Sequence, residues 1–129
     1  MKKCYICQLE KDFLEFNKDS SRKSGLRYGC KACHKEKRNN KKAYLYDFII
    51  QHFENNPCIS CGESNPILLD FDHLKDKKIG ISMAVKNQWS LEKLQDEIDK
   101  CQVLCANCHR MKTAKDQNWY MYNKLYKSK

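Results

Sequence analysis

The spacing of apolar residues predicts one long helix near the middle of the chain, from Ala32 to about Asn55. Its first half contains the segment KEKRNNKK (35–42), which is almost wholly polar. Its second half carries apolar or aromatic side chains at the three- and four-residue spacing of one helix face, namely Leu45, Phe48, Ile49, His52 and Phe53. Pro57 ends the helix, because proline lacks the amide hydrogen that a further turn needs. We interpret the segment as a connecting helix on which His52 is packed rather than binding a ligand.

After this helix the apolar pattern predicts two short strands and several shorter helices. Residues 66–73 (PILLDFDH) and 101–105 (CQVLC) are apolar runs of strand length. Residues 75–82 (KDKKIGIS) are expected to form a basic turn and a short extended piece. Residues 90–100 predict a helix, because Ser90 is a favourable N-cap and the apolar side chains that follow share one face. A further helix is expected from ANCHRMKTAK, and an aromatic tail should fold back on the core as a last helix through Trp119, Tyr122 and Tyr126.

The chain contains nine cysteines, and eight of them form four C-x-x-C pairs. A C-x-x-C turn places two sulfur atoms on one side of the chain, and two such turns complete the tetrahedral coordination of zinc. Pairing in order along the sequence gives one site from Cys4, Cys7, Cys30 and Cys33 and a second from Cys58, Cys61, Cys105 and Cys108. A crossed pairing is the alternative, and a redox role is disfavoured because no βαβ pattern surrounds the pairs. Cys101 stands outside the pairs and is expected to be a small buried strand residue.

The cysteines also bear on stability and compartment. A module of about 40–60 residues buries little apolar surface and usually needs a metal or disulfides to fold. The stretch MKKCYICQLEKDF turns polar at once, unlike a signal peptide, and the longest apolar run is too short to span a membrane. We therefore expect a cytoplasmic protein with reduced thiols, two structural zinc ions and no membrane partner.

The formal net charge is +9, and it is concentrated in the first part of the chain. Residues 1–46 contain 13 Lys/Arg and 5 Asp/Glu, whereas residues 47–129 contain 12 and 11. Such a basic excess suits a polyanion, because each neutralised phosphate releases bound counterions. Together with the zinc modules, this charge favours a nucleic acid as the partner; a solubilising surface is the alternative. The candidate DNA-binding residues are Arg22, Lys23, Arg27, Lys35, Lys37, Arg38, Lys75, Lys77, Lys78, Arg110 and Lys112.

Candidate catalytic chemistry lies between the third and fourth cysteine pairs, where Asp72 and His73 end a predicted strand. His109 directly follows the last pair, so the second zinc site should bring it close to them. The Asp72 carboxylate offers a hard oxygen to a divalent cation, and His109 offers a nitrogen to the same ion. His73 can then take a proton from a water molecule aimed at phosphorus. Two alternatives stay open: Asp72 and His73 form an incidental surface pair, or His109 replaces one cysteine at the zinc.

The order C-x-x-C, D-H, C-x-x-C-H resembles the HNH family of ββα-metal endonucleases, in the zinc-clamped form common in phages and mobile elements. The preceding ribbon with two C-x-x-C pairs is also similar to those proteins. The resemblance implies a metal-dependent endonuclease that hydrolyses DNA phosphodiester bonds. It implies His73 as general base, Asp72 and His109 as ligands of a catalytic Mg²⁺ or Mn²⁺, and zinc on the cysteines of the second site. For a phage-encoded protein, the cytoplasm would be that of the bacterial host.

One family position has no clear counterpart. The family's middle asparagine lies shortly before the last cysteine pair and orients the loop that carries the base. Here that neighbourhood reads EIDKCQVLC, with Lys100 near the expected place. Asn87 and Asn107 are further candidates, so the sequence leaves this role unassigned.

These patterns predict an α+β protein of small zinc-stabilised modules. A zinc ribbon (1–40) precedes the connecting helix (41–56), and a ββα-metal nuclease core with a helical tail (57–129) follows. The alternative function is a non-catalytic zinc-ribbon protein that binds nucleic acid. An assembly adaptor is a third reading, which the basic charge of residues 1–46 disfavours. The set of Asp72, His73 and His109 favours the enzyme, because a pure binding protein has no use for it.

Overall fold

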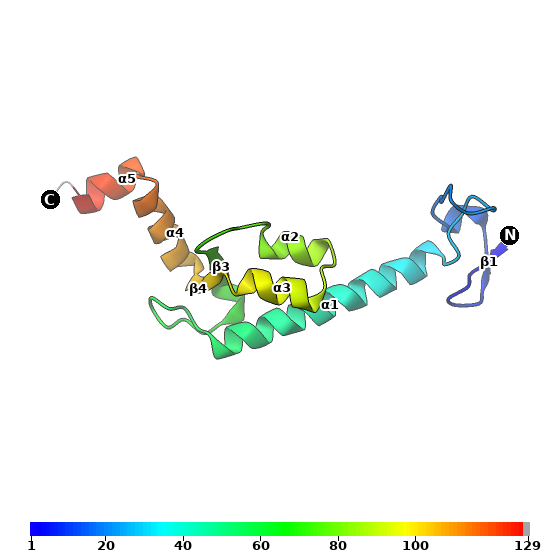
Figure 1. Cartoon of the computed structure of the whole chain (residues 1–129), viewed down its shortest axis with the longest axis horizontal. Helices are drawn as coiled ribbons and strands as arrows, with labels where there is room; N and C mark the ends of the chain where they lie inside the picture. The colour runs from blue at the N-terminus through cyan, green and yellow to red at the C-terminus, as the bar shows by residue number, and fades with distance from the viewer. Residues whose placement is uncertain (128–129) are drawn as a thin grey trace. The chain divides into compact units, whose positions relative to one another are not determined.

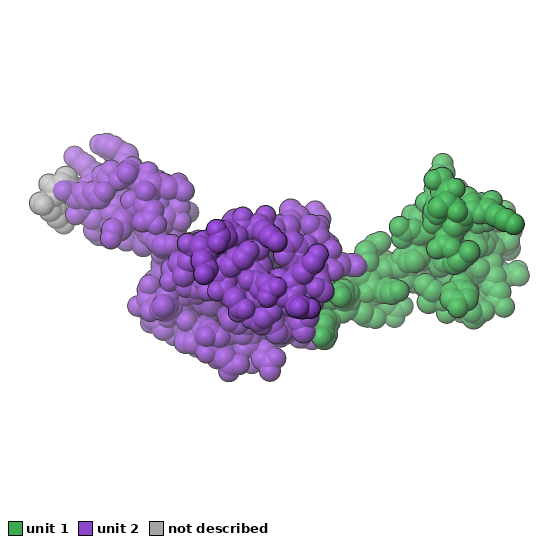
Figure 2. All heavy atoms as spheres, in the orientation of Figure 1, with its two compact units in different colours: residues 1–44 green, residues 45–129 purple. Residues whose placement is uncertain are grey.

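The long central helix is present as α1, Lys31–Asn55, in the computed structural model, which describes residues 1–127 (Figure 1). Leu45, Ile49 and Phe53 are its buried residues, as the predicted apolar face requires. The chain divides into two units, Met1–Tyr44 and a second that begins at Leu45, so α1 contributes residues to both (Figure 2). With two short sheets and several helices, the protein belongs to the α+β class.

The first unit has little apolar core. Strands β1 (Lys2–Lys3) and β2 (Glu10–Lys11) form a short antiparallel hairpin, and a 3₁₀ turn, η1 (Phe13–Glu15), follows. Its buried cluster consists of Cys4, Phe16 and Cys30, with three partly buried neighbours, Cys7, Leu26 and Cys33. Because four of these six side chains are cysteines, hydrophobic burial alone offers this unit little stability.

The second unit is built on an antiparallel pair of strands, β3 (Leu69–His73) and β4 (Cys101–Cys105). Leu69 pairs with Cys105 at one end of the ladder, and His73 pairs with Cys101 at the other. Two helices, α2 (Ile81–Lys86) and α3 (Leu91–Ile98), lie between these strands in sequence, and α4 (Ala106–Asp116) follows β4 directly. One continuous core is formed by residues of α1, both strands, α2 and α3, with Phe53 of α1 stacked on Phe71 of β3 at 4.6 Å between ring centroids.

Several predicted elements are confirmed, and their ends have local causes. The helix expected over 90–100 is α3, whose N-cap Ser90 accepts a hydrogen bond from the amide of Lys93 at 3.2 Å. Strand β4 occupies the predicted 101–105. Helix α4 begins at Ala106, one residue after Cys105, whose sulfur accepts a hydrogen bond from the amide of Cys108.

Two segments differ from expectation. The predicted strand 66–73 begins only at Leu69, because Pro66 starts a 3₁₀ turn, η2 (Pro66–Leu68), that Asn65 caps through a bond from the Ile67 amide. The short extended piece expected near residues 79–82 is wrong, since helix α2 begins at Ile81. Ile81, Ala84 and Val85 are buried, and their spacing is that of a helix face.

The aromatic tail is helical, with α5 (Tyr120–Tyr122) and a π-helical turn, η3 (Asn123–Lys127). The expectation that it folds back on the core is not borne out for the described residues. Trp119 lies against α4, where its amide donates to the carbonyl of Ala114 and its ring is 5.4 Å from the Arg110 guanidinium carbon. None of the tail residues up to Lys127 belongs to the core cluster. Among residues 1–127, no helix has the length and apolar character needed to cross a membrane.

Candidate functional site

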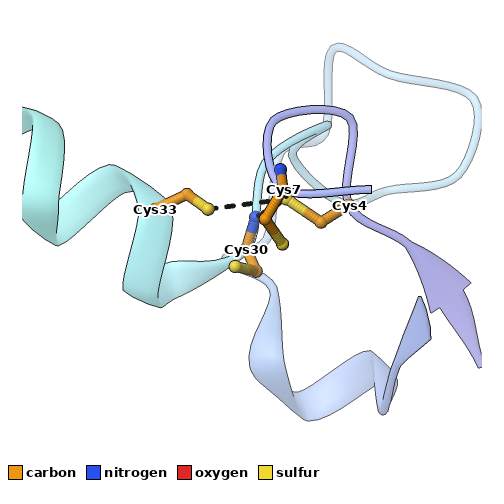
Figure 3. Close-up of side chains that lie close together, drawn as sticks. All are labelled: Cys4, Cys7, Cys30 and Cys33. Atoms are coloured by element: carbon orange, nitrogen blue, oxygen red, sulfur yellow. Dashed lines mark hydrogen bonds between the residues drawn. The ribbon is translucent and has the colours of Figure 1, made fainter. Parts of the chain in front are cut away.

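Each half of the cysteine set comes together as a group of four. The sulfur atoms of Cys4, Cys7, Cys30 and Cys33 all lie within 4.8 Å of one another, and those of Cys58, Cys61, Cys105 and Cys108 do the same. Figure 3 shows the first group, with Cys4 and Cys7 from the N-terminal turn, Cys30 just before α1 and Cys33 in its first turn. The pairing in sequence order is therefore confirmed over the crossed one, and His109 is not needed to complete either group. Each group can hold a structural zinc ion.

Backbone amides lower the pKa of one cysteine in each group. Cys4 Sγ accepts hydrogen bonds from the amides of Ile6 at 3.3 Å, Cys7 at 3.4 Å and Cys30 at 3.2 Å. Burial raises the pKa of the Cys4 thiol, but these amide bonds outweigh it and lower the pKa to about 6. Burial and amide bonds act in the same way on Cys58, whose pKa is also lowered to about 6. Both sulfurs are thus thiolates at neutral pH, which is the form that binds zinc.

The last thiol of each group needs a cation. Hydrogen bonding to Cys30 together with burial raises the pKa of Cys33 to about 12. The pKa of Cys108 is raised to about 12 by its bond to Cys105 and by burial. Four thiolates therefore cannot coexist at neutral pH without a positive charge among them. A zinc ion supplies that charge, so the donor set fits the metal.

The first group has a further positive neighbour. The ammonium nitrogen of Lys11, at the end of β2, donates to Cys30 Sγ at 3.3 Å. The hydrogen bond to Cys30 raises the pKa of Lys11. A side chain that hydrogen-bonds a metal ligand in this way orients the ligand and tunes its charge.

Cys101 lies outside both groups, as predicted. It occupies the first position of β4, and its thiol donates to the carbonyl of Glu97 at 3.4 Å. Burial raises its pKa to about 11, so it remains a neutral thiol. Cys101 is therefore a structural strand residue, although it is half-buried and not fully buried as predicted.

The second group of cysteines lies at one end of the β3–β4 ladder and directs the next helix. Cys105 is both the last residue of β4 and the N-cap of α4. Helix α4 consequently begins at the metal group and presents His109 and Lys112 to β3, where they contact Asp72. The second cysteine group thus positions the start of α4 against the strand that carries the predicted site.

His109 lies between two carboxylates of β3. Its Nε2 is 3.5 Å from Asp72 Oδ1, and its Nδ1 is 3.3 Å from Asp70 Oδ2. Asp70 and Asp72 are two residues apart, so they share one face of the strand. Sequence reasoning did not select Asp70, although the alternation in LDFDH contained the signal.

Asp72 is well supported as an anion. It is 9% exposed, and its Oδ2 accepts hydrogen bonds from Lys112 at 2.5 Å and Gln102 at 2.8 Å. Burial raises the pKa of the Asp72 carboxyl, but the bonds from Lys112 and Gln102 and the charge of Lys112 outweigh it, so the pKa is lowered. Oδ1 faces His109 and is the oxygen that remains for a cation.

His73 points to the other side of the sheet, as the strand alternation requires. Its Nε2 lies 3.2 Å from Oε2 of Glu97 on α3. Glu97 is 1% exposed and also accepts bonds from the ammonium of Lys100 at 3.2 Å and the amide of Lys78 at 3.3 Å. Burial raises the pKa of Glu97, but these bonds outweigh it and lower the pKa, so the carboxylate is ionised at neutral pH.

Sequence reasoning missed Glu97. A signal was present, because Glu97 lies three residues after Leu94 and next to Ile98, on the buried face of α3. A charged residue on such a face is seldom buried unless it is paired.

A cavity of about 340 Å³ connects the two histidines. His73 and His109 both line it, together with Asp70, Phe71, Lys77 and Ser82. Its apolar floor includes Ile49 and Phe53 of α1. The predicted base and one predicted metal ligand therefore line the same cavity. Asp72 is not among the lining residues, but it contacts His109, which is.

The predicted catalytic metal has two candidate ligands here rather than a complete set. Among residues 1–127, the two cysteine groups are the clusters of three or more His, Cys, Asp or Glu ligand atoms close enough for one ion. Asp72 Oδ1 and His109 Nε2 offer the oxygen and nitrogen types that Mg²⁺ or Mn²⁺ accepts. Their 3.5 Å separation is close to that of neighbouring ligands on one ion of this size.

Three of the candidate DNA-binding residues contact other side chains of the protein, and the other eight are exposed. Arg22 is held by Asp19 at 3.0 Å and stacks on Tyr28, with its guanidinium carbon 3.6 Å from the ring centroid. Arg110 lies over Trp119, and Lys112 is paired with Asp72. Exposed positions are occupied by Lys23, Arg27, Lys35, Lys37, Arg38, Lys75, Lys77 and Lys78.

Comparison of the chain with protein-family models, with curated proteins and with solved structures finds no match.

Proposed function

We propose that this protein is a metal-dependent endonuclease of the HNH type, which hydrolyses phosphodiester bonds of double-stranded DNA. The observation that carries the proposal is the approach of His109 Nε2 to Asp72 Oδ1, 3.5 Å apart, beside a cavity that His73 also lines. The order of elements supports it: two antiparallel strands, β3 and β4, are followed by α4, with four cysteines where β4 meets the helix. The family resemblance implies two strands followed by a helix, so this order supports the proposal.

In this proposal the residues have separate tasks. Asp72 and His109 hold a Mg²⁺ or Mn²⁺ ion, which when bound stabilises the charge that develops on the phosphate and on the leaving 3′ oxygen. His73 takes a proton from the attacking water. Lys77 lies at the same cavity and can hold a neighbouring phosphate. Both cysteine groups are structural, and the second, which includes the N-cap of α4, keeps that helix in place beside β3.

A non-catalytic nucleic-acid-binding protein is the second candidate, and one contact favours it. The Lys112 ammonium lies 2.5 Å from Asp72 Oδ2, so a cation of the protein already neutralises the proposed metal ligand. In a binding protein this ion pair would simply fasten α4 to β3. The exposed basic residues of α1 serve either function.

Cleavage of supercoiled plasmid separates the two candidates. The zinc-loaded protein should convert the plasmid to nicked or linear forms with Mg²⁺ or Mn²⁺, and excess chelator of these ions should stop the reaction. The products should carry a 5′ phosphate and a 3′ hydroxyl, because the 3′ oxygen is the leaving group. Binding without cleavage at any concentration of either metal would favour the non-catalytic protein.

A further inference from the structure

The buried carboxylate of Glu97 is the most unusual charge in the second unit. It comes from α3, and its 1% exposure leaves it no access to water. Its oxygens receive three donors: His73 at the end of β3, the amide of Lys78 in the following loop, and the ammonium of Lys100. A buried charge is costly unless it is fully paired, so a carboxylate kept here has to be explained.

The contact with His73 settles which ring nitrogen carries the hydrogen. A carboxylate that already accepts from an ammonium and an amide is ionised and can only accept. The 3.2 Å contact with His73 Nε2 is therefore an N–H donated by the ring. In the neutral imidazole the other nitrogen, Nδ1, then holds the free lone pair.

We propose that Glu97 is the positioning residue of His73, which it holds in the Nε2–H tautomer so that Nδ1 is the nitrogen that accepts the proton. The inference rests on the proposed endonuclease function and extends it, because it fills the orienting role that the sequence leaves unassigned. Glu97 itself touches neither substrate nor metal in this scheme. A carboxylate behind the histidine also stabilises the imidazolium that forms when the base is protonated.

The other candidates for that role fit less well. Lys100 donates to the carboxylate of Glu97 and to the carbonyl of Asp76, so it holds Glu97 in place and does not orient His73 directly. Asn87 is the C-cap of α2. Asn107 lies in the first turn of α4 and lines a different cavity, beside the aromatic tail. Glu97 is the residue whose side chain bonds the His73 ring.

The first test uses the wild-type zinc-loaded protein and needs no activity. Long-range ¹⁵N–¹H NMR of histidine-labelled protein distinguishes the two neutral tautomers of each ring, and His73→Ala identifies the His73 signals. In the neutral form of the His73 ring we expect the hydrogen on Nε2. A predominant Nδ1–H tautomer for His73 would overturn the proposal.

The second test compares Glu97→Gln with Glu92→Gln, which removes the same charge from an exposed position of α3. The amide introduced by Glu97→Gln can donate as well as accept, so the tautomer is no longer fixed. We expect Glu97→Gln to lower kcat about 10²-fold or more with KM and zinc content unchanged, and to mix the His73 tautomers. Glu92→Gln should match the wild type in all of these. A Glu97→Gln variant that is less stable yet keeps the wild-type kcat and tautomer would show a purely structural role and overturn the proposal.

The two proposals fail in different ways. If His73→Ala cleaves plasmid at the wild-type rate, the endonuclease scheme is wrong, whatever the tautomer of His73. If His73→Ala is inactive while Glu97→Gln retains full kcat, the scheme stands and the role of Glu97 is refuted.

Discussion

The Nε2 atom of His109 lies 3.5 Å from Oδ1 of Asp72, and the two residues come from different elements, α4 and β3. The approach follows from the second cysteine group, because Cys105 ends β4 and starts α4. A helix held at its first turn by a metal cannot rotate away from the strand beside it. The second cysteine group and the candidate catalytic pair are therefore linked through one helix.

The second zinc ion should be required for folding of the second unit. We expect Cys58→Ser to lose one of two zinc ions and to unfold this unit, because zinc binding contributes about 10 kcal/mol or more to such folds. Cys101→Ser is the matched control and should retain both ions, since Cys101 stands outside the groups. Elemental analysis and circular dichroism measure both effects. A wild-type protein with a single zinc ion would contradict the assignment.

Zinc affinity should rise with pH at both sites. Cys33 and Cys108 have pKa values raised to about 12, so each is protonated near pH 7 and must lose its proton to bind zinc. The pKa of Cys61 is raised as well. We therefore expect at least one proton released at the first site and at least two at the second, with affinity declining as the pH falls.

Calorimetric titration of zinc in buffers of different ionisation enthalpy counts these protons. Release of fewer than three protons in total at pH 7 would show that at least one of Cys33, Cys61 and Cys108 is already ionised without zinc, and would contradict the prediction.

The exposed basic residues at the start of α1 should supply much of the DNA affinity. We expect Lys35→Gln, Lys37→Gln and Arg38→Gln together to weaken binding and to flatten the plot of log affinity against log salt. The slope should fall by about 0.9 for each phosphate that the protein no longer neutralises. The control replaces three exposed lysines of the second unit, Lys86, Lys93 and Lys115, with glutamine and should leave the slope nearly unchanged. Equal effects of the two triple variants would show that DNA affinity depends on the net charge and not on the residues at the start of α1.

Substitutions of Asp72 and of Lys112 should change the affinity for Mn²⁺ in opposite directions. Asp72→Asn removes the anionic ligand, so we expect Mn²⁺ binding to weaken about tenfold or more. Lys112→Met removes the ammonium that competes for the same carboxylate, so Mn²⁺ should bind more tightly. Titration with Mn²⁺ followed by electron paramagnetic resonance, in zinc-loaded protein without DNA, measures both. If both variants bind Mn²⁺ as the wild type does, the ion is not held by Asp72.

Much of this architecture could be predicted from the sequence, because its signals are local. The four C-x-x-C pairs, the apolar face of α1 and the Ser90 cap each lie within a few residues, and each predicted its element correctly. The 3₁₀ turn at Pro66 and the helix at Ile81 were missed because short apolar runs fit a strand and a buried helix equally well.

The contacts of the site were harder to predict, because they depend on which faces meet. The sequence indicated Asp72 and His109 as partners but gave no reason to pair His109 with Asp70 as well. The bond between Glu97 and His73 joins residues 24 positions apart, through the packing of α3 against the sheet. Such a contact requires the relative placement of two elements, which no local pattern contains.

The most direct measurement of the central claim is the single-turnover rate of plasmid cleavage by His73→Ala, in zinc-loaded protein with Mg²⁺ or Mn²⁺. His34→Ala is the matched control, since His34 also follows a C-x-x-C pair but lies in the first unit. We expect His73→Ala to cleave about 10²–10⁴-fold more slowly than the wild type with DNA affinity and zinc content unchanged, because a general base acts only in the transition state. His34→Ala should cleave at the wild-type rate. Cleavage by His73→Ala at the wild-type rate, or no metal-dependent cleavage by the wild type itself, would contradict the account.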